Sequence, residues 1–287
     1  MSYCSTEGSI VAFMKQTVED LPVTKNLVIP NSDGFCSKRN YKCLVKNQED
    51  LDVVSKPEDV VGILCSRDFN DSRCIYMPLD DTSFEKGVVA HVQEKTTAVP
   101  WEDKKPIAYW RGSPTGAFFP TVRFLLVLRV VNVPIVDAKF VFALNPYNKA
   151  KLINFGEVAN TEDSRYWCPA ASLQDYLSYK YILIVDGNII ASAHQWVFAS
   201  GSVPIMITHP DNNYWFKQYL KPMENYVPVD YSLCDLEEKV RWLIDNDDKA
   251  KAIAANAMRF AETVFSPEFQ REYLQKRIQE VSQMTPA

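Results

Sequence analysis

Two polar loops follow predicted strands, and their residue types suit the binding of a phosphate group. The first runs from Arg111 to Thr115 and the second from Asp186 to Ser192. Each precedes a predicted helix, and a helix N-terminus offers free N–H groups and about half a positive charge to an anion. Neither loop has the GxGxxG or Walker A spacing. Spacing alone therefore names no nucleotide fold, and Gly112 and Gly187 are equally well explained as turn residues.

Arg123 lies ten residues after Ser113, on the predicted helix over 121–131. A lone helical arginine is usually a solvated side chain, and its place behind the first loop is what makes it a candidate. At an effective dielectric constant of about 20, a phosphate charge about 4 Å away contributes roughly 4 kcal/mol. A helix terminus contributes only about 0.3–2 kcal/mol. A phosphate bound here would depend mainly on Arg123.

Other ionisable residues lack the spacing of a catalytic or metal site. Asp80 and Asp81 have no third ligand nearby in the sequence, and we interpret the pair Asp247–Asp248 as a solvated turn between helices. His91 and His209 have no partners at the spacing of a catalytic triad, so we interpret both as structural or surface residues. We therefore expect no metal site.

Alternating strands and helices position the two loops. Tyr181 to Val185 is apolar at every position, which is typical of a strand covered on both faces. It is followed by a predicted helix over 191–199 and a strand over 203–207, which together form a βαβ unit. Further strands are predicted over 26–30, 59–65, 107–110 and 136–142, and further helices over 10–18, 235–244, 249–264 and 266–282. The fold class is α/β with parallel sheets.

Composition limits the class of protein. The 287 residues are 47% apolar and 23% charged, which is typical of about two globular domains. The net charge of -5, without a basic stripe, argues against nucleic acid as a partner. The apolar runs are too short to span a membrane. Seven scattered cysteines and the absence of a leader-like start predict a reduced, cytoplasmic protein.

Five segments, in order along the chain, resemble motifs of glycosyltransferase family 90. That family contains the Rumi-type protein O-glucosyltransferases, capsule-associated xylosyltransferases and bacterial lipopolysaccharide-modifying enzymes. The matching segments are Tyr109–Gly116 with Arg123, Lys180–Gly187, Ser200–Val203, Tyr219–Val229 and Asp235–Ala254. Each motif is weak alone, but the five together are specific, and they cover about residues 105–265.

The resemblance implies a GT-B-like fold, in which two Rossmann-like domains flank a cleft. The first domain would span 1–104 on the acceptor side, with a C-terminal helix over 266–287 packing back on it. The second would span 105–265 and bind the sugar nucleotide. The charged segment 94–106, which contains Pro100 and ends at Pro106, is the expected boundary.

Site residues follow from the same resemblance. Asp33 matches the family's catalytic base, and a competing register places Asp68 there instead; the distance to the matching segment Ile75–Pro78 favours Asp33. The donor-binding residues would be Arg111, Gly112, Ser113, Thr115, Arg123, Asp186, Gly187, Ser192, Ala193 and His194. One departure concerns His194, because the family usually has an arginine in this segment. We expect His194 or a backbone N–H to take its place.

The implied reaction is the transfer of a sugar from a UDP-sugar to a hydroxyl group of a glycan, with inversion and without a metal or other cofactor. Xylose is expected slightly ahead of glucose. The alternatives are a UDP-glucose-dependent glucosyltransferase and an inactive sugar-nucleotide- or glycan-binding module. The chain is most similar to the short viral or bacterial members, so the expected location is the cytoplasm, or the host-cell cytoplasm if the chain is viral.

Overall fold

A computed structural model of the chain describes five strands within the first 76 residues and most of the chain from residue 88 to residue 283. The gaps in this second part are 97–98, 117–120, 142–159, 188–190, 192, 211 and 213. Contacts divide the chain into two units. The first comprises Met1–Val88, Asp211–Tyr219 and Thr263–Ala287, and the second comprises Val89–Pro210 and Leu220–Glu262.

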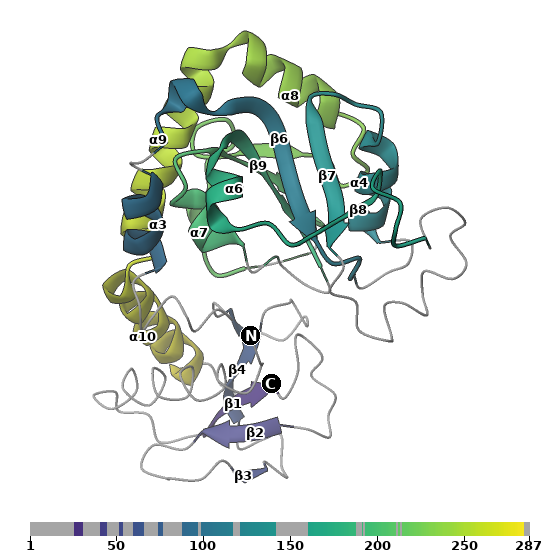
Figure 1. Cartoon of the computed structure of the whole chain (residues 1–287). Coiled ribbons are helices and arrows are strands. Elements are labelled where there is room, and N and C mark those ends of the chain that lie inside the picture. Colours follow the sequence, from purple (N-terminus) through teal and green to yellow (C-terminus); the bar gives the residue numbers. More distant parts are fainter. Residues whose placement is uncertain are drawn as a thin grey trace. The chain divides into compact units, whose positions relative to one another are not determined.

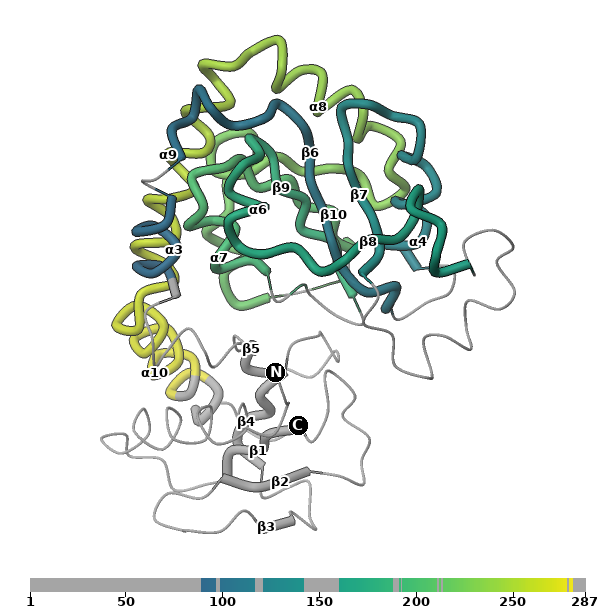
Figure 2. Tube along the Cα trace, viewed as in Figure 1, coloured from purple at the N-terminus to yellow at the C-terminus, as the bar shows by residue number. Residues whose placement is uncertain are grey.

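The second unit contains a six-stranded sheet in which every neighbouring pair is parallel. Its strands are β6 (Lys105–Gly112), β7 (Val136–Val141), β8 (Trp167–Cys168), β9 (Tyr179–Val185), β10 (Val203–Ile207) and β11 (Val227–Val229). Their order in space is β11-β10-β9-β6-β7-β8, the Rossmann order, in which the direction of winding reverses between β6 and β9. Figure 1 shows the arrowheads of β6 and β7 at the same edge, and Figure 2 follows β6, β9 and β10 side by side.

Burial of these strands explains their sequences. β10 is buried along its whole length, and β9 is buried from its second residue, which accounts for their unbroken apolar runs. β7 alternates between buried and half-buried residues, so it has one covered face. The α/β class and the parallel sheet expected here are confirmed.

Helices connect the strands and cover both faces. Those assigned to the second unit, in whole or for most of their length, are α3 (Val88–Thr96), α4 (Val122–Val130), α6 (Leu173–Leu177), α7 (His194–Phe198), α8 (Leu236–Asp245) and α9 (Asp247–Val264), with the short η2 (Trp101–Asp103). The Thr121 side chain caps α4 by accepting the N–H of Phe124. α4 leads from β6 to β7 and α7 from β9 to β10, in opposite directions across the sheet. Right-handed crossovers therefore place them on opposite faces.

The first unit has a five-stranded sheet of order β3-β2-β1-β4-β5. Its elements are β1 (Asn26–Pro30), β2 (Tyr41–Leu44), β3 (Asp52–Val53), β4 (Val60–Cys65), β5 (Cys74–Tyr76), η4 (Lys217–Tyr219) and α10 (Pro267–Gln283). β1 pairs in parallel with β4, and β4 with β5, whereas β2 is antiparallel to both of its neighbours. This sheet is thus mixed rather than wholly parallel. Ten residues separate β1 from β2, and seven separate β2 from β3. Both connections are shorter than the dozen or so residues of a usual parallel crossover, which is consistent with antiparallel pairing. α10 packs against β4 and β5.

Several element boundaries differ from those expected. The strand predicted over 107–110 extends to Gly112, so Arg111 and Gly112 belong to β6 rather than to a loop. The helix predicted over 191–199 is the shorter α7. The segment expected as a linker over 94–106 contains the end of α3, then η2 and the start of β6, and contacts place it in the second unit. The helix predicted over 10–18 lies outside the described residues, and the acceptor-side and donor-side assignments stay predictions, as does the cleft.

Candidate functional site

Arg123 joins the ends of β6 and β9 at the carboxyl edge of the sheet. Its Nε and Nη2 atoms donate to the carbonyl oxygen of Val185, at 3.2 and 2.9 Å. Its Nη1 atom donates to Thr115 Oγ1 at 2.8 Å and to the carbonyl oxygen of Ser113 at 3.3 Å. Ligands of doubly wound sheets bind outside the carboxyl ends of the strands, where the winding reverses. The structure therefore gathers residues of both predicted loops at the place where this fold binds ligands.

Gly187 lets the Arg123 guanidinium approach the backbone after β9. A Cβ atom at this position would lie 3.0 Å from Arg123 Nη2 and 3.2 Å from Cζ, closer than most Cβ contacts. Gly112 has a different role, because a Cβ there would lie 2.4 Å from the indole of Trp110. A side chain at position 112 would thus force a shift of Trp110, whereas one at position 187 would displace the Arg123 guanidinium by only a few tenths of an ångström.

Asp186 binds His209, which we interpreted above as a structural or surface residue. Its carboxylate is buried, and Oδ2 accepts the backbone N–H of His209 at 2.9 Å. His209 lies two residues after β10, at the same edge as Asp186 and Gly187. The sequence did contain one indication that His209 lies near the site, because it follows the predicted strand over 203–207 by two residues. The spacing of a catalytic triad along the sequence does not reveal a site whose residues come from neighbouring strands.

Arg111 makes internal contacts that give its expected donor-binding role no support. Its Nη2 atom pairs with Asp137 Oδ2 at 2.7 Å, and its guanidinium lies 4.2 Å from the centroid of the Tyr109 ring. Its carbonyl oxygen accepts the hydroxyl of Tyr176 at 2.8 Å. Arg111 therefore ties β6 to β7, since Asp137 is a residue of that strand.

His194 does not fit as a cationic substitute for the family's arginine. The side chain is buried at the start of α7, and Nδ1 contacts the carbonyl oxygen of Ala191. Burial lowers the pKa of His194 to about 4, so the imidazole is neutral near pH 7. Ala193 lies at the N-cap of α7. Three other predicted site residues lie outside the described part of the chain: Asp33, Asp68 and Ser192.

The opposite, amino edge of the sheet carries two buried lysines. Lys104, just before β6, donates to Ser202 Oγ at 3.0 Å and to the carbonyl oxygen of Ser200 at 3.3 Å, and burial lowers its pKa to about 8. Lys180 pairs with Asp247 Oδ1 at 2.7 Å, while Trp101 Nε1 donates to Asp247 Oδ2 at 3.0 Å. Asp247 begins α9 rather than lying in the turn expected here, and its carboxylate is 46% exposed while it binds this lysine.

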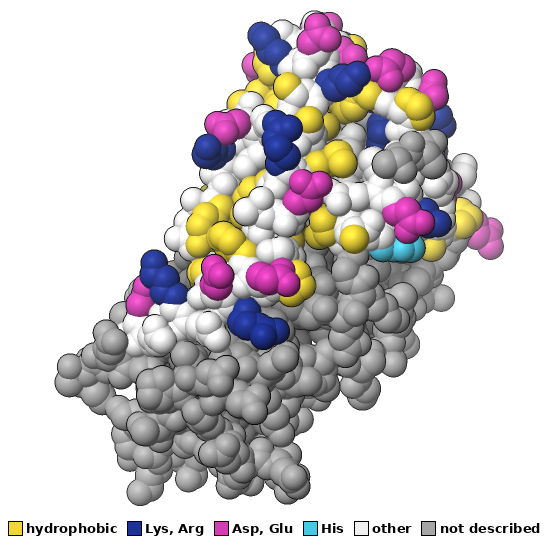
Figure 3. Space-filling view, turned by 90° about the vertical axis from the view of Figure 1, so that its left-hand side faces the viewer, with side chains coloured by type: hydrophobic (Ala, Val, Ile, Leu, Met, Phe, Trp, Pro, Cys, Tyr) yellow, Lys and Arg dark blue, Asp and Glu magenta, His cyan; other side chains and the backbone are white. Residues whose placement is uncertain are grey.

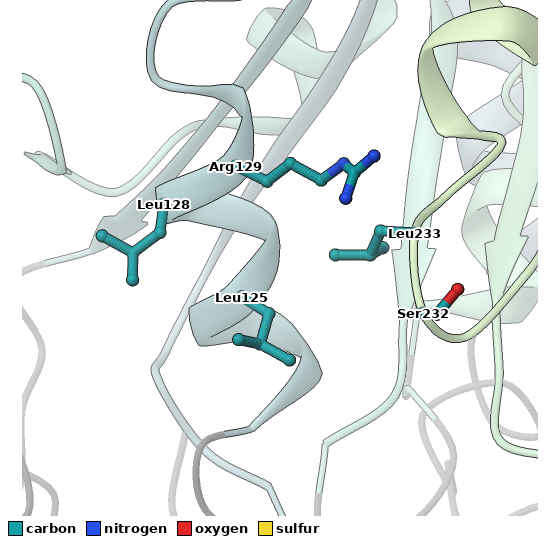
Figure 4. Close-up of a pocket in the computed structure, with 5 residues that line it drawn as sticks. All are labelled: Leu125, Leu128, Arg129, Ser232 and Leu233. Atoms are coloured by element: carbon teal, nitrogen blue, oxygen red, sulfur yellow. The ribbon is translucent and has the colours of Figure 1, made fainter.

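A hollow of about 310 Å³ lies between α4 and the loop after β11 (Figure 4). Its lining consists mainly of leucine side chains with two polar residues: Leu125, Leu128, Arg129, Ser232 and Leu233. Arg123 is not among them. The hollow is thus separate from the residues gathered at the ends of β6 and β9.

The part of the chain that the structure describes was searched for metal sites and for membrane-spanning helices. Among them no group of three His, Cys, Asp or Glu side chains could hold a metal ion, and no helix is long and apolar enough to cross a membrane. On the face in Figure 3, basic and acidic side chains are interspersed along the coloured part of the surface. Cys168 and Cys234 are free thiols.

Comparison with known proteins gives a family and several relatives. The model of a family described as glycosyl transferase family 90 matches residues 85–286. Uncharacterized protein 179R of Invertebrate iridescent virus 6 is 30% identical over 200 residues, which is 61% of this chain and 17% of that protein. Protein O-glucosyltransferase 2 of Danio rerio is 31% identical over 208 residues, 68% of this chain and 37% of that protein. The chain thus spans less than two fifths of the length of either relative.

A solved structure resembles this chain at low sequence identity. It is that of Anabaena Alr3699/HepE in complex with UDP-glucose, with a TM-score of 0.46 and 11% identity over 79% of this chain and 65% of that chain. A likeness of this degree carries no functional conclusion.

Proposed function

The chain belongs to glycosyl transferase family 90, and we propose that it transfers a sugar from a UDP-sugar to a hydroxyl group of a glycan acceptor. The observation that carries this proposal is the bridge that Arg123 makes between Val185, Ser113 and Thr115. It places a guanidinium where the Rossmann sheet reverses its winding, the usual location of a nucleotide's phosphates.

In the proposed reaction an acceptor oxygen displaces UDP in one step, with inversion at the anomeric carbon. The bond from acceptor oxygen to anomeric carbon forms as the bond from that carbon to the β-phosphate oxygen breaks. A base takes the hydroxyl proton, which typically contributes about 10²–10⁴-fold to the rate. Asp33 is the proposed base and Asp68 the alternative, both by resemblance.

The departing diphosphate needs positive charge or hydrogen-bond donors, and we assign this task to Arg123 and to backbone N–H groups of the loops that it joins. Preorganised donors of this kind stabilise charge as it develops in the transition state. His194 is neutral near pH 7, so it does not supply that charge. Metal independence stays part of the proposal, and EDTA tests it.

The sugar is the least constrained part of the proposal. Xylose was expected slightly ahead of glucose, whereas one of the relatives is named as a protein O-glucosyltransferase. We therefore propose UDP-glucose and UDP-xylose as the two donors to compare first. The acceptor glycan and the cytoplasmic location stay predictions.

The test is release of UDP by the purified chain from UDP-glucose, UDP-xylose and other UDP-sugars, with EDTA present. Slow hydrolysis of one donor, lost in Asp33→Ala while UDP still binds, is the expected result. If Asp33→Ala retains turnover and Asp68→Ala loses it, the alternative base is correct. Inhibition by EDTA that Mn²⁺ reverses would contradict the metal-free mechanism.

An inactive binding module is the second candidate function. It is favoured by the neutral, buried His194 in a segment where the family usually has an arginine. Binding of UDP without turnover of any donor, in the presence of candidate acceptor glycans, would support this candidate. If UDP does not bind at all, both candidates fail.

A further inference from the structure

The outer side of α4 carries large apolar side chains that are exposed. Arg123 and Arg129 are the only polar residues of this helix, and a helix that is apolar on all sides is normally covered on all sides. The side that faces the sheet is buried, but Leu125 and Leu128 are 42% and 39% exposed. Met223 is the one other large apolar side chain that is exposed in the described part of the chain. The outer side of α4 thus has the composition of a surface that another molecule covers.

The hollow of about 310 Å³ beside these leucines has a second wall that is fixed by hydrogen bonds (Figure 4). This wall is the loop after β11, which contributes Ser232 and Leu233. Asp230 holds the loop, because its Oδ1 atom accepts the N–H of Ser232 at 2.8 Å and its carbonyl oxygen accepts the N–H of Leu233 at 2.8 Å. Leu233 has a φ of 65°, a left-handed conformation that leucine rarely adopts. The hollow is therefore preformed, and a partner that enters it has little of the loop to order.

Opposite charges lie on the two sides of the hollow. Arg129 lies on the α4 side, where it is exposed and forms no hydrogen bond or ion pair with any residue that the structure describes. Figure 4 shows it extending from α4 toward Leu233. Asp230 lies on the loop side and is exposed, and hydrogen bonds from Ser232 lower its pKa, so its carboxylate is ionised near pH 7. The positive and the negative side are separated by the apolar lining.

Such a surface is complementary to itself. Its residues, here called the α4 patch, are Leu125, Leu128, Arg129, Asp230, Ser232 and Leu233. A two-fold rotation about an axis through the patch places α4 of one copy against the loop of the other, which is the arrangement of an isologous dimer. The exposed leucines of each copy are then covered, and each Arg129 meets Asp230 of the other copy. We infer that the α4 patch is a dimer interface and that its partner is a second copy of this chain.

The small size of the α4 patch sets the expected strength of the dimer. Stable interfaces bury about 800 Å² on each partner, and smaller ones belong to weak or transient complexes. Two leucines and one charge pair, each repeated by the two-fold axis, should give a Kd of about 10 µM. At the nanomolar concentrations of a kinetic assay the dimer is dissociated, so steady-state rates report the single chain.

Sedimentation velocity of the whole chain, from about 1 to about 200 µM, tests the inference. A species of twice the mass of one chain should increase with concentration. Leu128→Asp should raise Kd at least ten-fold, because it brings a charge into the apolar contact. Met223→Asp adds the same charge at an exposed apolar residue outside the α4 patch, so it is the matched control and should leave Kd unchanged. A chain that stays monomeric at every concentration, or a dimer that Leu128→Asp does not weaken, would overturn the inference.

Exchanging charges between two variants tests whether the contact joins different copies. Arg129→Glu places two acidic groups opposite each other, and Ser232→Arg places two basic groups opposite each other, so each variant alone should dimerise several-fold more weakly. Both positions are exposed, and circular dichroism checks that the variants fold. In an equal mixture, the new acidic group of one copy faces the new basic group of the other, and the mixed dimer should regain most of the lost affinity. If the mixture dimerises as weakly as each variant alone, the two walls do not meet across an interface and the inference is wrong.

Discussion

The two edges of the six-stranded sheet both carry basic side chains, but they use them differently. At the amino edge, Lys104 and Lys180 are at least nine-tenths buried and bind Ser200, Ser202 and Asp247, all within the second unit. At the carboxyl edge, Arg123 is half-buried, and its described hydrogen bonds go to two backbone carbonyls and a threonine hydroxyl. The two lysines of the amino edge are thus part of a packed edge, whereas Arg123 lies at the edge where ligands of doubly wound sheets bind.

This difference explains why motif matches do not all mark a site. Tyr109–Gly116 and the end of Lys180–Gly187 reach the carboxyl edge, whereas Ser200–Val203 and the start of Lys180–Gly187 lie at the amino edge. In parallel α/β sheets the ligand-binding loops follow the strands rather than precede them. We therefore infer that the motif residues at the amino edge stabilise the fold, whereas those at the carboxyl edge contribute to ligand binding.

The largest expected effect is at Arg123. Arg123→Ala should lower kcat/KM by about 10²-fold or more, because one stabiliser of the leaving group is removed. Steady-state kinetics with the preferred UDP-sugar measures it, and Arg129→Ala, an exposed arginine of the same helix, is the control. A loss below three-fold would remove Arg123 from the proposed mechanism.

A pH dependence of stability is expected at Lys104. Its pKa is lowered from 10.5 to about 8 by burial, so between these values the unfolded chain binds the proton that the folded chain has lost. The free energy of unfolding should therefore rise with pH across this window, by roughly 3 kcal/mol relative to Lys104→Met. Urea denaturation at pH 7 to 10.5 measures this difference. Parallel curves for the two proteins would show that Lys104 is solvated.

A smaller loss of stability is expected at Asp247. Asp247→Asn leaves Lys180 buried without its carboxylate, and because Asp247 is itself 46% exposed we expect about 1–2 kcal/mol rather than the full cost of a broken buried pair. KM for the donor should not change. Asp248→Asn, the exposed neighbour, is the control for thermal denaturation. A changed KM with unchanged stability would reverse the assignment of the two edges.

The smallest effect is expected at Gly187. In Gly187→Ala the new methyl group displaces the Arg123 guanidinium by a few tenths of an ångström, which should raise KM for the donor a few-fold. In the Arg123→Ala background the same substitution should have no further effect, since the displaced group is absent. Additive effects in this double-mutant cycle would show that Gly187 acts independently of Arg123.

Strongly patterned segments were predictable because their periodicity reflects burial. The apolar run Tyr181–Val185 gave a strand buried on both faces, and Val203–Ile207 coincides with β10. The helices over 235–264 were likewise within two residues of α8 and α9. The ends of strands were harder to predict where they contain polar residues or glycine. Arg111 and Gly112 have the composition of a turn, but they continue β6 because they pair with β7.

The amino-acid sequence by itself determined the α/β class, the four central strands of the six-stranded sheet and the family, because hydrophobic periodicity and ordered motifs are local properties of the chain. Tertiary structure alone decided which polar residues meet. It buried His194 and made it neutral, paired Arg111 with Asp137 and Lys180 with Asp247, and brought His209 to Asp186. These outcomes depend on strand order and register, which join residues 23 to 67 positions apart; such pairings arise only when the sheet assembles.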